Sequence, residues 1–184
     1  MKLRSILILV AILAVATAVY FATRPVEEPP PTPDPKPRVW AFEMEELEHV
    51  LIELPRLDMR ESFIKHEDRQ WYFDDLTDTQ VDSDRWGGGI PLILSGPLLE
   101  KIIAEDATEE RLTDFGLTSP SMKIILTTED EEITNIEAGD ANPDGSIYYI
   151  RLAESNNVYA INSSWYEVLE RLVLEPPYPS EDEE

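Results

Sequence analysis

Short stretches of alternating apolar and polar residues fill most of the chain after residue 38 and predict a series of β-strands. Such alternation is typical of a strand that buries one face, because successive side chains point to opposite sides. A first group of strands is expected at residues 39–42, 50–54, 62–66 and 70–73, with a turn at 43–46. A second group is expected at residues 122–127, 132–137, 147–152 and 158–161, joined by polar turns.

Helical spacing replaces this alternation between the two groups of strands. Apolar residues recur there on one helical face, namely Trp86, Ile90, Ile93, Leu94 and Pro97. The glycines at 87–89 and Pro91 oppose a regular helix, so a short or kinked helix is expected. The apolar residues from 98 to 103 either extend this helix or form a separate turn.

Two further short helices are predicted from their capping residues. Thr108 suits the N-cap of a helix that runs through Phe115, and Gly116 suits the left-handed residue that ends it. Ser164 and Glu167 form a capping-box pair at the start of a later apolar helical stripe. This order of elements predicts an α+β fold with a largely antiparallel sheet and a few short helices, preceded by a single N-terminal transmembrane helix.

The N-terminal segment has the composition of a membrane anchor. Seventeen uncharged, mostly apolar residues occupy positions 5–21, which is near the lower limit for a helix that crosses a hydrocarbon core of ~30 Å. Lys2 and Arg4 precede this segment and only Arg24 follows it closely, so the positive-inside rule places the N-terminus in the cytoplasm. We therefore expect a single-pass protein of the plasma membrane whose bulk is extracytoplasmic.

A cleaved signal peptide is the alternative interpretation of the same segment. Small residues at Ala14, Ala16 and Ala18 offer two small-x-small cleavage sites. The apolar run continues past both sites, which favours a retained anchor. The expected organisation is a cytoplasmic stub, a transmembrane anchor, a proline-rich linker, an extracytoplasmic domain and an acidic disordered tail, at residues 1–4, 5–22, 23–37, 38–175 and 176–184.

The linker and the charge limit the classes of partner. Seven prolines between Pro25 and Pro37 predict an extended spacer. The chain from Pro25 onward has a formal charge of −26, since it holds all 38 acidic residues and all but three of the 15 basic residues. Nucleic-acid phosphates are repelled by such a field, and basic proteins or divalent cations are the electrostatically natural partners. The alternative is that the charge only keeps an exported domain soluble and monomeric. The absence of cysteine excludes disulfides and thiolate sites.

One loop resembles the first half of a calcium-binding loop. Asp140, Asn142 and Asp144 place oxygen atoms at alternate positions, and Gly145 allows a sharp bend. The twelfth position should be a bidentate Glu but is Arg151. Asn-Pro-Asp-Gly is also strong turn chemistry, so a hairpin loop is the favoured interpretation and weak calcium binding is the alternative. These three residues are the candidate weak calcium site, and no other cofactor is expected.

Catalytic machinery is not indicated by the sequence. His49 and His66 are the only histidines, and no Gly-x-Ser-x-Gly motif presents a serine beside either of them. Five aspartates between residues 74 and 84 are interpreted as a solvated loop. We expect no catalytic residues and no enzyme activity.

Three segments together resemble one known family. They are residues 114–120 (DFGLTSP), residues 136–140 with 145–151 (IEAGD and GSIYYIR), and residues 158–161 (VYAI). This set is similar to the bacterial domain-of-unknown-function 4340 family. The resemblance implies a membrane-anchored protein of uncharacterised activity, and some members are encoded beside transporters of the gliding-motility type.

These observations support two hypotheses about the function. The first is a membrane-anchored extracytoplasmic interaction or assembly module with a protein partner in the envelope, accessory to a membrane transport complex. The second is an extracytoplasmic domain that binds a cation or another small ligand.

Overall fold

The computed structural model describes residues 13, 17, 20, 37–86 and 89–179. The chain divides into two units, Met1–Pro35 and Lys36–Glu184, and every described strand belongs to the second. Of the predicted anchor only Leu13, Thr17 and Tyr20 are described, and these are helical. Among the described residues, no helix combines the length and apolar character needed to span a bilayer. The remaining anchor positions, nearly all of the predicted linker and residues 180–184 lie outside the described ranges.

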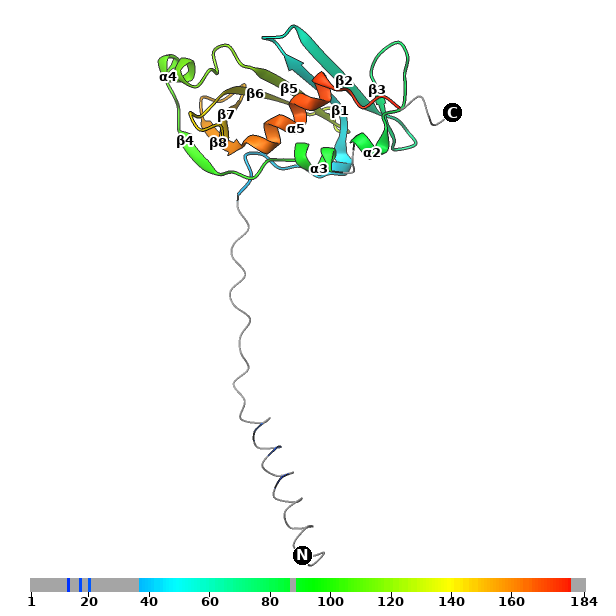
Figure 1. Cartoon of the computed structure of the whole chain (residues 1–184), viewed down its shortest axis with the longest axis horizontal. Helices are drawn as coiled ribbons and strands as arrows, with labels where there is room; N and C mark the ends of the chain where they lie inside the picture. The colour runs from blue at the N-terminus through cyan, green and yellow to red at the C-terminus, as the bar shows by residue number, and fades with distance from the viewer. Residues whose placement is uncertain (1–12, 14–16, 18–19, 21–36, 87–88, 180–184) are drawn as a thin grey trace, which may run out of the picture. The chain divides into compact units, whose positions relative to one another are not determined.

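An antiparallel sheet of eight strands forms the second unit (Figure 1). Its spatial order is β3-β2-β1-β5-β6-β7-β8-β4, so the two predicted groups of strands meet where β1 pairs with β5. The strands are β1 (Leu47–Leu54), β2 (Met59–Lys65), β3 (Trp71–Phe73), β4 (Lys101–Ala104), β5 (Met122–Thr128), β6 (Ile133–Ala141), β7 (Ile147–Leu152) and β8 (Val158–Asn162). The expected α+β fold with an antiparallel sheet is confirmed.

Short helices lie between and after these strands. A 3₁₀ turn, η1 (Met44–Glu46), precedes β1, where the sequence predicted a turn. The predicted kinked helix is present as two short helices, α2 (Ser83–Trp86) and α3 (Ile90–Leu94). A fourth element, α4 (Glu109–Asp114), begins at the expected cap, since the Thr108 side chain accepts from the Arg111 amide. The longest described helix is α5 (Ser163–Leu174).

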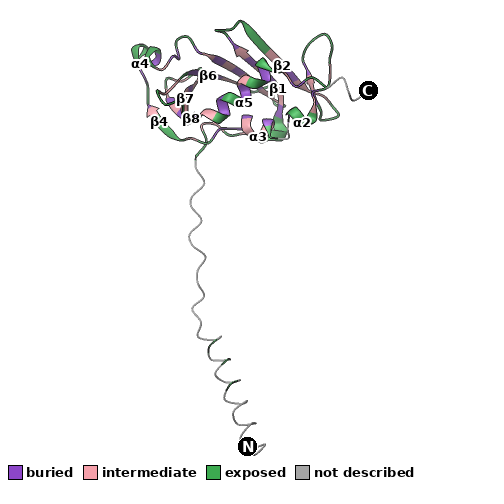
Figure 2. Cartoon of the chain, viewed as in Figure 1, coloured by how far each residue is buried: buried purple, intermediate pink, exposed green. Residues whose placement is uncertain are grey.

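The main core lies between α5 and one face of the sheet (Figure 2). Alternate residues of β1 and β5 point to this face and are fully buried, as the period-two pattern requires. The buried residues of α5 lie opposite them: Trp165, Tyr166, Leu169, Leu172 and Val173. Each such side chain contributes roughly 1.5–3 kcal/mol when fully buried. Burial of this stripe is therefore what holds α5 against the sheet.

On the opposite face of the sheet, α4 covers one end. A smaller cluster packs there around α4, and in it Phe115 contacts Tyr149 with ring centroids 4.7 Å apart. On the remaining part of this face, charges of alternating sign follow one another across five neighbouring strands. This charge row consists of Arg60, Glu53, Lys123, Glu137 and Arg151, each paired in register with the next. Cross-strand pairs of opposite charge stabilise the register.

Two predicted elements were wrong. Residues 39–42 form no strand, because their amides bind a loop instead of a strand: Val39 donates to Pro97 and Phe42 donates to Ser95, each at 3.2 Å. The apolar residues after Pro97 neither extend the helix nor form a turn. Ile102 and Ile103 lie in the edge strand β4, which pairs with β8, whereas Leu98 forms an isolated bridge with Arg38. Pairing with a strand more than 50 residues away in sequence overrode the local helical spacing.

The cap of the last helix also differs from its prediction. Asn162, not Ser164, is the N-cap of α5, and its side chain accepts from the Ser164 amide at 2.9 Å. The helix therefore starts one residue before Ser164, directly after β8, and the predicted capping box with Glu167 is not the cap. Asn and Ser side chains both accept from the free amides at the start of a helix, so the sequence alone did not decide which of the two is the N-cap.

Two tryptophans bind the end of α3 to the rest of the domain. The indole N–H of Trp40 donates to the Leu94 carbonyl at 3.0 Å, and that of Trp165 donates to the Ile93 carbonyl at 3.1 Å. These carbonyls belong to the last turn of the helix, which has no partners of its own. A Cβ atom on Gly96 would lie 1.9 Å from the Trp40 carbonyl oxygen, so only glycine permits this close packing.

Candidate functional site

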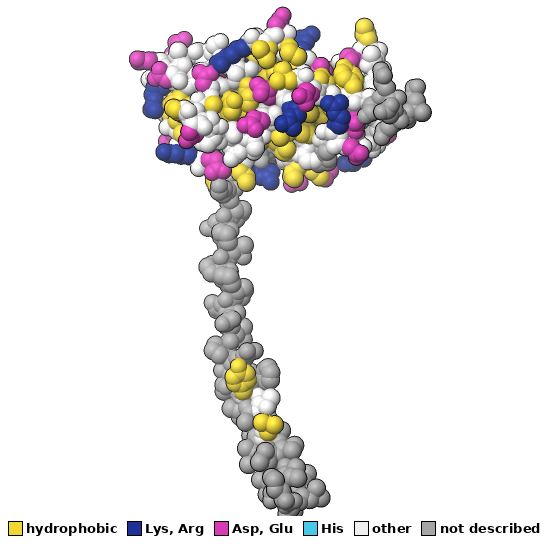
Figure 3. All heavy atoms as spheres, viewed as in Figure 1, with side chains coloured by type: hydrophobic (Ala, Val, Ile, Leu, Met, Phe, Trp, Pro, Cys, Tyr) yellow, Lys and Arg dark blue, Asp and Glu magenta, His cyan; other side chains and the backbone are white. Residues whose placement is uncertain are grey.

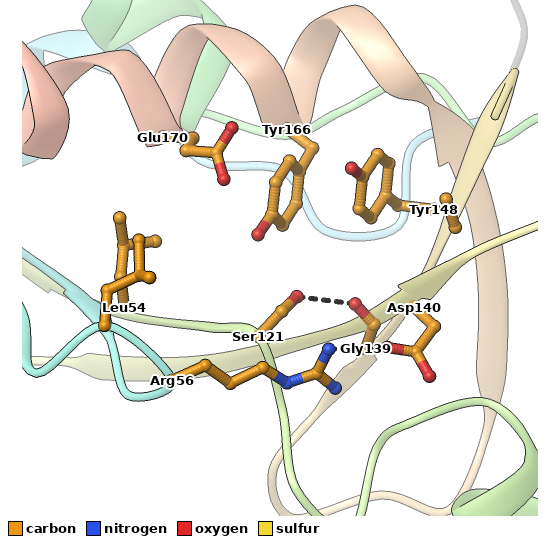
Figure 4. A pocket seen from close by; sticks show the side chains of 10 residues that line it. Leu54, Arg56, Ser121, Gly139, Asp140, Tyr148, Tyr166 and Glu170 are labelled. Carbon is orange, nitrogen blue, oxygen red and sulfur yellow. Dashed lines mark hydrogen bonds and ion pairs between the residues drawn. The ribbon is translucent and has the colours of Figure 1, made fainter.

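A pocket of about 280 Å³ opens between α5 and the ends of four strands (Figure 4). It is lined by β1 and the turn after it, by the start of β5, by the end of β6 and by the start of β7. The side chains of α5 point towards the sheet from the other wall. The lining residues are Leu54, Arg56, Leu57, Ser121, Gly139, Asp140, Ala141, Tyr148, Tyr166 and Glu170.

Gly139 brings β6 close to the loop that follows α4. The Asp140 amide donates to the Phe115 carbonyl at 2.8 Å. A Cβ atom on Gly139 would lie 2.1 Å from that same carbonyl oxygen, so a side chain there would force the two segments apart. The Gly-Asp pair of one family-like segment is therefore placed directly against the Asp-Phe-Gly of another.

An ion pair joins the two sides of the pocket mouth. Arg56 and Asp140 lie 2.8 Å apart, measured from guanidinium Nη1 to carboxylate Oδ1. Arg56 also donates from Nη2 to the Ser119 carbonyl at 2.9 Å. The two side chains are 45% and 49% exposed, so solvent screens the pair and its contribution to stability is small. Its effect is geometric, because it fixes both groups at the rim.

Two stacked tyrosines form one wall of the pocket. The rings of Tyr148 and Tyr166 are nearly parallel, with centroids 3.8 Å apart. Burial raises the pKa of Tyr148, and the nearby charges of Glu170 and Glu167 raise it further. Burial also raises the pKa of Tyr166, although Ser121 opposes this shift by hydrogen bonding. Both phenols are therefore neutral hydrogen-bonding groups in a locally negative environment.

The serine of the pocket is engaged with the backbone. The Ser121 hydroxyl lies 2.5 Å from the Gly139 carbonyl, to which it donates (Figure 4), and 3.2 Å from the Ala138 carbonyl. No histidine is among the lining residues. Serine needs an adjacent base to act as a nucleophile, and here its proton is directed at a carbonyl oxygen.

Each of the three predicted calcium ligands is engaged in another contact. Asp140 pairs with Arg56 at the pocket. The Asp144 carboxylate accepts from the Ser146 amide at 2.9 Å, and the side-chain Oδ1 of Asn142 accepts from the Ile147 amide at 3.2 Å. The last two thus stabilise the turn between β6 and β7. Among the described residues, no group of three or more His, Asp or Glu side chains is placed to hold a metal ion.

A serine–histidine–aspartate cluster was missed by sequence reasoning. His49 Nε2 lies 2.9 Å from the Ser62 hydroxyl and 3.0 Å from an oxygen of Asp74, and Ser62 also donates to Asp74 at 3.1 Å. In a catalytic triad the serine and the aspartate bind opposite ring nitrogens, whereas here both meet the same one. The register of the β1–β2 hairpin could have indicated this contact. It pairs Ser62 with Leu51 and so places Ser62 diagonally opposite His49.

The aspartate-rich loop at residues 74–84 contacts a histidine that directly follows β2. His66 lies 3.3 Å from Asp78 and stacks on Tyr72, with ring centroids 4.1 Å apart. Asp75 accepts from the side chain and the backbone of Thr77, and these hydrogen bonds lower its pKa. The loop carboxylates therefore have local structural roles.

The start of the predicted tail also has contacts. Tyr178 stacks on Phe73 of β3 with ring centroids 4.0 Å apart, and the Pro177 carbonyl accepts from the Asp82 amide at 2.8 Å. Arg85 donates to the carbonyls of Glu175 and Tyr178. Residues 175–178 thus close one end of the main core.

One family model matches part of the chain. Residues 92–172 match the family model described as Domain of unknown function (DUF4340), which confirms the resemblance seen in the sequence. The match starts in α3 and ends in α5, so it includes most of the pocket lining but not Leu54, Arg56 or Leu57. No curated protein and no solved structure matches the chain.

Proposed function

We propose that this protein is a membrane-anchored, extracytoplasmic interaction or assembly module, accessory to a membrane transport complex. The observation that carries the proposal is the internal pairing of the polar groups at the pocket. Arg56 is held by Asp140, and Ser121 donates to a backbone carbonyl. Catalysis requires a nucleophile or base that is free to meet its substrate, whereas docking requires only a shaped and fixed surface.

The anchor in this proposal is supported by the N-terminal sequence. Residues 5–21 are uncharged, and the basic residues before them outnumber the single Arg24 on the other flank. The prolines between Pro25 and Pro37 would hold the domain away from the bilayer as a stiff spacer. A tether of this kind favours binding to a neighbour in the same membrane, because it keeps the local concentration of the two partners high.

Charge supports a basic protein as the partner. Acidic side chains are scattered among apolar ones on the face shown in Figure 3, in keeping with the formal charge of −23 for the whole chain. A field of one sign accelerates encounter with a partner of the opposite sign and disfavours like-charged partners.

A small-ligand binding domain is the second candidate, and the pocket itself favours it. A concave site with a few convergent polar groups is the usual form of a ligand site. The pocket volume of about 280 Å³ is close to the lower end for drug-sized ligands, which lies at roughly 300 Å³. This size suits a small group more than an extended ligand.

Co-purification of the full chain from its membrane in mild detergent tests the proposal. We expect a stable protein partner to be recovered with the native chain and lost with Arg56→Gln, which removes the ion pair at the pocket rim. Arg60→Gln is the matched control, since Arg60 is exposed on the opposite face of the sheet and belongs to the charge row. Repeated recovery of the folded native chain without any partner would refute an assembly role.

A further inference from the structure

Glu170 is the one charged group of the pocket that is not neutralised by a neighbour. It projects from α5 into the pocket beside Tyr166 (Figure 4). Among the described residues, no hydrogen bond or ion pair holds its carboxylate. The other two charged groups of the lining, Arg56 and Asp140, satisfy each other at 2.8 Å. One guanidinium and two carboxylates leave the pocket with a single uncompensated negative charge.

The surroundings of Glu170 suit a cation on an apolar stem. The stacked rings of Tyr148 and Tyr166 present to the pocket the ring surface that the stacking leaves uncovered, and Leu54 and Leu57 add apolar surface. Aromatic faces attract cations, and methylene groups pack well against such rings. The raised pKa values of both tyrosines, caused first by burial and then in part by Glu170, agree with a negative potential at this wall.

The size of the pocket limits the occupant to one side chain. A volume of about 280 Å³ has room for a long side chain but not for a folded segment. The net charge of −23 on the chain selects against anionic segments of a partner.

We propose that this pocket receives a basic side chain, lysine in its simplest form, from a protein partner, with Glu170 as its counter-ion. The inference rests on the proposed docking function and names the chemistry of the contact. The ammonium group binds Glu170 at the end of the pocket, while the methylene stem lies along the tyrosine rings. Arg56 keeps Asp140 at the rim and thereby leaves Glu170 as the single acceptor for the incoming charge.

Titration of the purified full chain with two capped tripeptides tests this inference. One is acetyl-Gly-Lys-Gly-amide, and the other replaces lysine with norleucine, which has a similar stem but no charge. Ring signals of ¹³C-labelled tyrosine report binding. We expect the lysine peptide to bind saturably with a dissociation constant on the order of millimolar and to shift Tyr148 and Tyr166, because a single side chain buries little surface.

Two variants test whether binding of the lysine peptide depends on Glu170 itself. Glu170→Gln should weaken the lysine peptide by about fivefold, which is typical of the loss of a partly exposed charge pair. Glu110→Gln removes one charge from α4 and should change the affinity by less than about twofold, since only the long-range field is altered. Tyr148 and Tyr166 resonances of the free variants check that the pocket is intact.

Several outcomes would overturn the inference. Equal affinity for the lysine and norleucine peptides, an unchanged affinity in Glu170→Gln, or no saturable binding of either peptide would each do so. Recovery of the partner from the membrane by the Glu170→Gln protein at native yield would also count against the pocket contact. That last result would leave the docking function standing, because the partner would still be captured.

Discussion

Gly116 and Asp140 come from two separated family-like segments and pack against each other. A Cβ atom on Gly116 would lie 2.5 Å from the Asp140 carboxylate carbon, and Gly116 itself has a φ of +72°. Glycine is needed there both for the backbone conformation and for the space. The two segments are therefore parts of one structural unit at the pocket.

Gly116→Ala should lower the free energy of unfolding by about 2–3 kcal/mol, measured by chemical denaturation. The left-handed backbone costs about 1–2 kcal/mol, and displacement of the Asp140 carboxylate from Arg56 adds to it. Gly145→Ala is the matched control, since Gly145 has a φ of +74° and no atom lies within 4 Å of the point that its Cβ atom would occupy. Equal losses in the two variants would show that the contact with Asp140 has no energetic importance.

Gly139→Ala should be more damaging than either of these variants. Its Cβ atom would meet the Phe115 carbonyl oxygen at 2.1 Å, and a backbone atom cannot move aside as a side chain can. We expect a loss of at least about 3 kcal/mol, within the range of severe packing errors. Gly89→Ala, with open space around its Cβ position, should be neutral or slightly stabilising. A mild effect of Gly139→Ala would contradict the close approach of β6 and the α4 loop.

Glu61→Gln should raise the midpoint of thermal unfolding at neutral pH. Burial, and then the charge of Asp75, raise the pKa of Glu61 above its ordinary value of 4.5. The folded protein thus binds this proton more tightly than the unfolded chain does, so Glu61 lowers stability as the pH rises through the raised pKa. The gain from Gln should be present at pH 7 and absent at about pH 3, where both states are protonated.

Glu67→Gln provides the control for this pH experiment. Glu67 is exposed in the turn between β2 and β3, so its substitution lowers the net negative charge without relieving burial. The stabilisation at pH 7 should be clearly larger for Glu61→Gln. If the stabilisation does not depend on pH, or is the same in both variants, it comes from the overall charge of the protein and not from the burial of Glu61.

Lys123→Glu should interrupt the charge row on the second face of the sheet. Lys123 lies in register between Glu53 and Glu137, so the variant would line up three carboxylates on adjacent strands. Like charges directly opposite are destabilising, and each changed pair is worth roughly 0.2–1 kcal/mol. Two pairs change, so we expect a loss of about 0.4–2 kcal/mol at low salt and a smaller loss at high salt.

Arg60→Glu is the matched charge reversal at the end of the same row. Arg60 faces one glutamate, Glu53, so its reversal should cost about half as much as that of Lys123. Unfolding in urea at two ionic strengths separates the two variants. A loss that does not depend on salt would attribute both effects to packing instead of charge.

Calcium should not stabilise the full chain measurably. Asp140 is engaged by Arg56, and hydrogen bonds to Ser146 and Asn142 lower the pKa of Asp144 within the turn. Calorimetric titration with calcium should therefore give no saturable heat, and the unfolding temperature should not change with added calcium. Saturable binding that is lost in Asp144→Ala would instead support the predicted cation site.

The alternation of apolar and polar residues was sufficient to predict most of the strands and the fold class. The alternation predicted strands correctly where the side of the sheet to which a residue points follows from its position in the local sequence, as in β1, β5 and β7. It was wrong for β4, whose apolar residues have helical spacing but pair with β8. Local spacing cannot report a partner that lies more than 50 residues further along the chain.

The sequence by itself determined the segments that carry the family signature, the acidic charge and the anchor-like N-terminus. Each depends on residue type and local order. Only the tertiary structure decided that Arg56 pairs with Asp140, that Ser62 meets His49 and that Glu170 is left unpaired at the pocket. Those relationships depend on the order of strands in the sheet and on the position of α5, which are set by long-range burial and not by any neighbouring residues.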